Sequence, residues 1–123
     1  LKANQALWAS FLIETPSQKI YMGGDSGYDT HFAEIGKQYP GIDLAILENG
    51  QYNEDWKYIH TMPQYLGQVA RDLNAEKILT VHHSKYALAR HCWDEPLKNA
   101  MNLKEKDSLN VLMPIIGEVV RLK

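Results

Sequence analysis

Residues 20–28 read IYMGGDSGY, in which a short apolar strand runs into glycines that flank a single carboxylate, Asp25. Glycine has no side chain to cover a neighbour, so an acid between glycines at a strand end is exposed and fixed in direction. Such a carboxylate is available to a metal ion or a substrate. The motif alone fits a second explanation equally well, a turn in which the aspartate caps backbone amides.

A second apolar run, residues 77–81, is followed by His82 and His83. The ends of sheet strands that are separated by helices converge on one side of an α/β sheet, so we expect His82 and Asp25 at the same rim. Carboxylate and imidazole are common ligands of zinc, iron and manganese. A hydrogen-bonded core histidine is the alternative for His82. His83 should point to the opposite side of the strand, so the two histidines are not interpreted as a bidentate pair.

The order of apolar runs and amphipathic segments predicts an α/β fold with site residues at strand ends. We expect strands at residues 7–14, 19–22, 42–47 and 77–81, helices at 30–39, 62–73 and 94–101, and two short strands around Pro114 and Gly117. A polar loop is expected between the third strand and the second helix. His60 ends this loop, where its imidazole is suited to proton transfer, or is simply a residue near a helix N-terminus.

The composition argues for one ordinary globular domain or part of one. The chain has 123 residues, 45% of them hydrophobic, and a formal net charge of −2. This charge gives no basic field for nucleic acid, and no apolar run has the roughly 20 residues needed for a transmembrane segment. The single cysteine, Cys92, cannot form an internal disulfide, which fits a reducing compartment and predicts a cytoplasmic location. We interpret Cys92 as a buried or bystander thiol.

Four motifs in order carry a resemblance to a known family: GDSGY at 24–28, IDLAIL at 42–47, HTMP at 60–63 and VH at 81–82. Over residues 7–98 the chain resembles the second half of metallo-β-lactamase-fold hydrolases. Within them it is most similar to the branch of N-acyl-phosphatidylethanolamine-hydrolysing phospholipase D and its bacterial relatives, with Ser26 in place of the usual threonine. The resemblance implies half of an αββα sandwich, a mixed sheet with flanking helices, of which residues 1–123 form the C-terminal portion.

The resemblance also implies roles for three residues. Asp25 matches the carboxylate that bridges two metal ions, His82 matches a terminal ligand of one of them, and His60 matches a catalytic histidine outside the metal ligands. Two divalent ions are implied, with zinc expected and manganese or iron as alternatives. Their shared hydroxide would attack a phosphodiester, a lactone or a similar ester or amide of a small-molecule substrate. Relatives commonly have Trp and Gly after the metal-binding histidine, whereas His83 and Ser84 stand here, so the substrate stays open.

The family's first-half motif, His-x-His-x-Asp-His, does not occur in this sequence. Since that motif supplies most of the metal ligands, we expect weak or absent metal binding by this chain alone. The chain is therefore interpreted as the C-terminal half of a hydrolase, inactive in isolation. An exposed sheet face predicts self-association or pairing with the missing half. The alternative is a non-catalytic half-domain that acts as a binding or assembly module.

Overall fold

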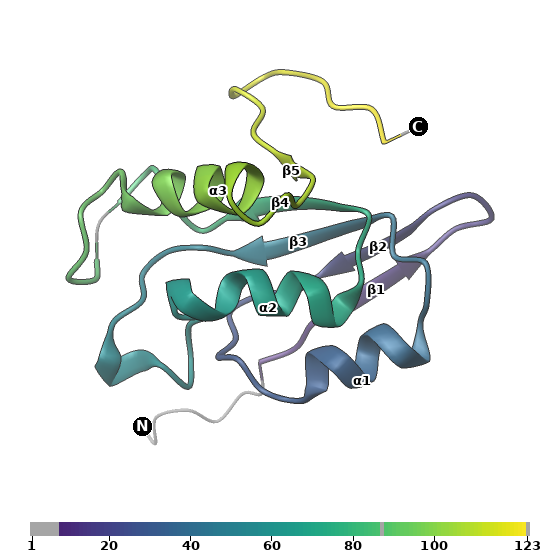
Figure 1. Ribbon diagram of the computed structural model, residues 1–123, viewed down its shortest axis with the longest axis horizontal. Helices are drawn as coiled ribbons and strands as arrows, with labels where there is room; N and C mark the ends of the chain where they lie inside the picture. Colours follow the sequence, from purple (N-terminus) through teal and green to yellow (C-terminus); the bar gives the residue numbers. More distant parts are fainter. Residues whose placement is uncertain (1–7, 87, 123) are drawn as a thin grey trace, which may run out of the picture.

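The computed structural model describes residues 8–86 and 88–122, which form a mixed sheet with helices packed against it (Figure 1). The elements in chain order are β1 (Phe11–Glu14), β2 (Lys19–Met22), α1 (His31–Gln38), β3 (Leu44–Glu48), the 3-10 turn η1 (Glu54–Trp56), α2 (Pro63–Leu73), β4 (Lys77–Val81), α3 (Glu95–Glu105) and β5 (Val111–Leu112). The sheet order is β1-β2-β3-β4-β5. β1 is antiparallel to β2, and the other pairs are parallel. The predicted α/β class with a mixed sheet is confirmed.

One row of side chains across all five strands forms the floor of the core. The strand register aligns Leu12, Tyr21, Ala45, Ile78 and Val111. All five belong to or pack on one hydrophobic cluster, which the helices complete. Figure 1 shows α1 and α2 side by side in front of the sheet. Because successive strand residues alternate between faces, the helices pack against every second side chain of each strand.

The neighbouring row belongs to the opposite face of the sheet and is also apolar. It aligns Phe11, Met22, Ile46, Leu79 and Leu112. Phe11 is 64% exposed and Met22 is 40% exposed, and the other three are half-buried. We call this set the open-face row. An apolar row of this kind on a sheet is typical of a surface that packs against another layer.

The tail departs from the sequence prediction. Val111–Leu112 is a strand, but residues 118–122 are not. The Glu118 carboxylate accepts a hydrogen bond from the backbone N–H of Ile115, and the Glu118 N–H donates back to the Ile115 carbonyl. These bonds close a turn around Gly117, whose φ is 90°. The local turn thus uses the N–H of Glu118, the first backbone donor of the predicted strand.

Three smaller predictions are also revised. The first strand begins at Phe11, while its predicted start at residue 7 lies outside the described residues. The third strand ends one residue later than predicted, at Glu48. Cys92 is exposed, so the thiol is not a buried one.

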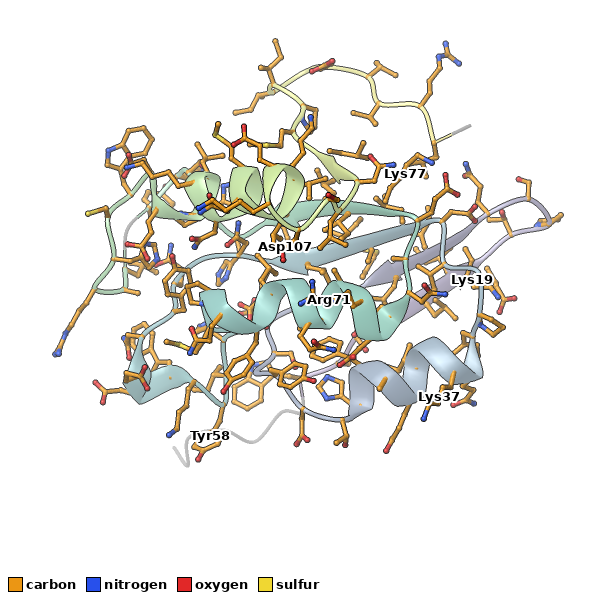
Figure 2. All side chains as sticks on the ribbon, viewed as in Figure 1. Lys19, Lys37, Tyr58, Arg71, Lys77 and Asp107 are labelled. Carbon is orange, nitrogen blue, oxygen red and sulfur yellow. The ribbon has the colours of Figure 1, made fainter. Side chains whose placement is uncertain are left out.

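Charged side chains are spread over the surface rather than gathered (Figure 2). Lys19 pairs with Glu14, and Arg71 lies 3.5 Å from Asp107. Among the helices of the described residues, none has both the length and the apolar character of a membrane span.

Candidate metal centre

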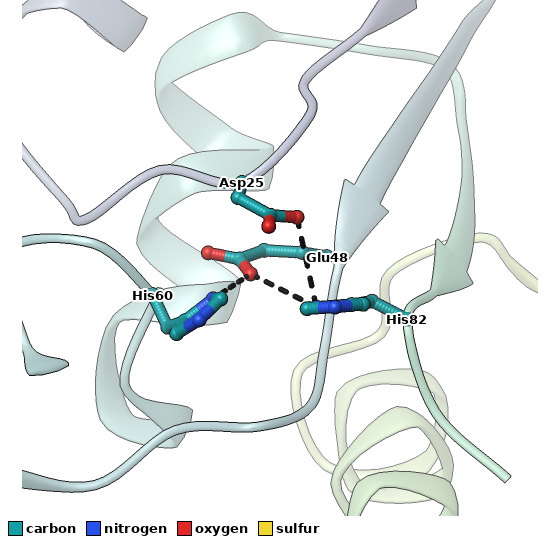
Figure 3. A group of neighbouring side chains, drawn as sticks. All are labelled: Asp25, Glu48, His60 and His82. Carbon is teal, nitrogen blue, oxygen red and sulfur yellow. Dashed lines mark hydrogen bonds and ion pairs between the residues drawn. The ribbon is translucent and has the colours of Figure 1, made fainter. Parts of the chain in front are cut away.

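Four side chains from four segments meet at one rim of the sheet (Figure 3). Asp25 follows β2, Glu48 ends β3, His60 precedes α2, and His82 follows β4. One potential ligand atom from each lies within 4.8 Å of the other three. The sequence singled out Asp25, His60 and His82, and the structure brings these three together. Glu48 is the member that sequence reasoning missed.

Glycines allow the Asp25 loop to take this position. Gly24 has a φ of 63°, a left-handed conformation that favours glycine. A Cβ on Gly27 would lie 2.6 Å from the carbonyl oxygen of Lys57. The GDSGY loop therefore packs directly on the backbone of the segment before His60, which brings Asp25 towards the histidine.

His82 is held in an unusual backbone conformation. Its φ is 68°, a left-handed value that typically costs a non-glycine residue about 1–3 kcal/mol. Gly50 supports this bend, because a Cβ there would lie 2.3 Å from the His82 carbonyl oxygen. The chain thus turns sharply at the end of β4, and this turn directs the His82 imidazole towards Asp25 and Glu48. The His83 Nε2 lies 3.1 Å from the Thr80 hydroxyl instead, and burial lowers the pKa of His83.

Glu48 is buried at the middle of the cluster, with 4% of its surface exposed. Its Oε1 accepts hydrogen bonds from the backbone N–H groups of Ser26 at 3.0 Å and Thr61 at 2.7 Å. Its Oε2 lies 2.6 Å from Nδ1 of His60. Burial raises the pKa of the Glu48 carboxyl, and the bonds from His60, Ser26 and Thr61 offset part of that rise. Oε2 also lies 3.4 Å from Nδ1 of His82, so the carboxylate contacts all three loops that carry the site.

Asp25 and His82 face each other across a gap suited to a cation. Oδ1 of Asp25 lies 3.6 Å from Nδ1 of His82, and both side chains are partly exposed. Two ligand atoms on one tetrahedral zinc ion are about 3.3 Å apart, given metal–ligand bonds near 2.0–2.1 Å. The centres of the His60 and His82 imidazole rings are 5.3 Å apart. Donor types and spacing thus fit a divalent ion, although two exposed ligands leave most coordination positions to other groups.

Cavities lie on both sides of the centre. One of about 240 Å³ adjoins His82 and is lined by Gln51, His82, His83, Lys85, Tyr86 and Leu88. The other, of about 140 Å³, adjoins Asp25 and reaches His31 and Tyr21. Gln51 shapes the first cavity, because its Oε1 accepts from the N–H groups of Leu88 and Ala89. A substrate thus has room next to either of the two exposed side chains.

Comparison with known proteins settles the family. The beta-lactamase superfamily domain matches residues 1–83, more than half of the chain. The chain belongs to this superfamily. RomA of Klebsiella pneumoniae, named as an outer membrane protein, is 60% identical over 82 residues, which cover 67% of this chain and 62% of RomA. The mitochondrial N-acyl-phosphatidylethanolamine-hydrolyzing phospholipase D of Saccharomyces cerevisiae is 34% identical over 110 residues, which cover 85% of this chain and 24% of that protein.

Solved structures give the same fold for this superfamily member. Igni18, a metallo hydrolase from Ignicoccus hospitalis, matches with a TM-score of 0.68 and 19% identity over 89% of this chain and 43% of that chain. The predicted relationship to metallo-β-lactamase-fold proteins and to the phospholipase D branch is confirmed. The chain spans less than two thirds of the length of RomA, of the yeast protein and of Igni18.

Proposed function

We propose that the chain carries part of the metal centre of a metal-dependent hydrolase. One observation supports this most directly: ligand atoms from four separate segments lie within 4.8 Å of one another. Folding has to bring the ends of β2, β3 and β4 together for that cluster to form. Two of its members, Asp25 and His82, remain partly exposed, so solvent or a substrate can reach them.

The proposed roles are those implied by the resemblance to metallo-β-lactamase-fold hydrolases. Asp25 is the bridging carboxylate, His82 is a terminal ligand, and His60 transfers protons without binding metal. Divalent ions, zinc before manganese or iron, would supply Lewis acidity and activate water at neutral pH. The Nδ1 atom of His60 lies against Glu48, which orients the ring and leaves Nε2 free to accept a proton.

The remaining ligands are proposed to come from another part of the domain. Structural metal sites hold zinc with about four protein ligands, and catalytic sites with about three. Two exposed donors therefore predict weak binding by residues 1–123 alone. The open-face row, with Phe11 64% exposed, offers an apolar surface for the part that completes the sandwich. A second copy of the chain is the alternative occupant of that face.

The proposed reaction is hydrolysis of a phosphodiester, lactone or related ester or amide in a small molecule. The yeast relative is named for hydrolysis of N-acyl-phosphatidylethanolamine, a phosphodiester. Specificity would depend on Lys85, Tyr86 and Leu88, which line the larger of the two cavities beside the site. The relatives' names place them in an outer membrane and in mitochondria, and for this chain the cytoplasmic location stays a prediction of its cysteine content.

The second candidate function is a non-catalytic assembly module that keeps the fold. The partial exposure of the open-face row is the observation in its favour. A buried, fully bonded Glu48 beside two imidazoles is more than an assembly role requires, which favours the hydrolase.

Equilibrium dialysis against zinc, with metal counted by mass spectrometry, tests the proposal. Asp25→Ala and His82→Ala should each lower the zinc affinity about tenfold or more, a change of about 1.4 kcal/mol. Asp29→Ala is the matched control, since Asp29 lies in the same loop and is exposed. Equal zinc affinity for the parent chain and both site variants would contradict the proposed metal centre.

A further inference from the structure

Glu48 has every hydrogen-bonding direction on one oxygen occupied by backbone. Oε1 accepts from the N–H groups of Ser26 and Thr61, and the Thr61 hydroxyl also donates to the Ser26 carbonyl at 2.6 Å. These bonds fix the plane of the carboxylate. The other oxygen, Oε2, is consequently held in place, 2.6 Å from Nδ1 of His60 and 3.4 Å from Nδ1 of His82, so His60 is its nearer partner.

This contact determines which nitrogen of His60 carries the proton. A neutral imidazole has one N–H donor and one nitrogen that accepts, and the partner of one nitrogen sets the state of the other. An ionised carboxylate accepts and does not donate, so a charged Glu48 requires the proton on Nδ1 of His60. Within residues 8–86 and 88–122, no group of the protein bonds to Nε2 of this ring. Nε2 is therefore left as a proton acceptor.

We propose that Glu48 is a positioning residue that holds His60 in the Nδ1–H tautomer and so presents Nε2 as the base. The consequence for catalysis rests on the proposed hydrolase, but the tautomer itself does not. Glu48 acts through His60 rather than on a substrate, because the carboxylate is 4% exposed.

The geometry argues against the simpler idea that Glu48 only staples loops together. A loop staple needs Oε1 alone, since that oxygen receives both backbone N–H groups. The 2.6 Å approach of Oε2 to the ring adds nothing to the Ser26–Thr61 connection. Carboxylate–imidazole pairs of this kind fix ring orientation and tautomer in many metal sites.

Glu48→Gln separates the two roles. A glutamine keeps an oxygen for the N–H groups of Ser26 and Thr61, but places an NH2 group against Nδ1 of His60. Nδ1 must then accept, so the proton moves to Nε2. A loop staple would leave the tautomer of His60 unchanged.

The experiment is two-bond 1H–15N correlation NMR on metal-free chain labelled with 15N-histidine, under alkaline conditions in which the imidazoles are neutral. In the parent chain, the His60 Nδ1 should show the shift of a protonated nitrogen and Nε2 that of an unprotonated one. Glu48→Gln should reverse the pattern. Glu54→Gln is the control, because it makes the same carboxylate-to-amide change at an exposed position, and it should keep the parent pattern.

An unprotonated Nδ1 in the parent chain overturns the proposal, whether or not Glu48→Gln folds. An unchanged pattern in a folded Glu48→Gln variant overturns it as well. Neither result depends on metal or activity, so failure of this test is distinguishable from failure of the zinc titration above.

Discussion

Removal of the Glu48 side chain should destabilise the fold far more than loss of one charge suggests. Glu48→Ala removes the hydrogen-bond acceptor of the Ser26 and Thr61 backbone N–H groups. Each buried donor left unsatisfied costs about 1–3 kcal/mol, so the two together should lower the free energy of unfolding by about 2–6 kcal/mol. The His60 imidazole also loses its partner, which adds to the loss.

Glu48→Gln sharpens this prediction. The amide oxygen can still accept both backbone bonds, so the expected loss is only about 1 kcal/mol. Urea unfolding followed by circular dichroism provides the comparison, with stability taken from midpoints at a constant slope. Glu54→Ala, at an exposed position, should change stability by less than about 0.5 kcal/mol. If Glu48→Ala is no less stable than Glu54→Ala, the carboxylate does not join the site loops and the reasoning is wrong.

Three further predictions concern packing, pH and association. Gly27→Ala should lower the free energy of unfolding by about 1–3 kcal/mol in urea, because the added Cβ would lie 2.6 Å from a backbone carbonyl oxygen. Gly67→Ala in α2 is the control: its Cβ would meet only the ends of side chains, so the change should be neutral or slightly stabilising. Burial lowers the pKa of His83 from its ordinary 6.5, so the unfolded chain binds more protons just below that pH. The free energy of unfolding should therefore fall as pH drops through 6.5 towards the lower folded-state pKa. His83→Asn should reduce this pH dependence, and an equal pH dependence in the parent chain and the variant would exclude His83 as its cause. Phe11→Asp should weaken self-association about tenfold in sedimentation experiments, while Ile116→Asp in the exposed tail should not, and equal association of both variants would exclude the open-face row.

The strands and helices that carry the site could be predicted because their signals are local. An apolar run followed by glycines indicated β2 and the Asp25 loop, and the run before His82 indicated β4. The spacing of apolar residues indicated α2, directly after His60. Each signal lies within a dozen residues of the feature that it predicts, so no tertiary information was needed.

Glu48 could not be assigned in this way, because its role depends on three distant partners. Ser26 and Thr61 donate to it from loops 22 and 13 residues away in the chain. Its sequence signal, an acid that ends a buried apolar strand, fits the rule that site residues follow strand ends. The predicted strand at residues 118–122 failed for the opposite reason: an apolar pattern was present, but its first residue, Glu118, closes a turn with Ile115 instead.

The central claim is that Asp25 and His82 form one cation site, and Mn²⁺ titration observed by NMR tests it most directly. Paramagnetic Mn²⁺ broadens amide signals near its binding position and detects weak sites as well as tight ones. The account predicts selective broadening around Asp25 and His82 at low Mn²⁺, loss of that selectivity in Asp25→Ala and His82→Ala, and its retention in Asp29→Ala. Broadening centred on other carboxylates, or a pattern that survives both site substitutions, would contradict the account.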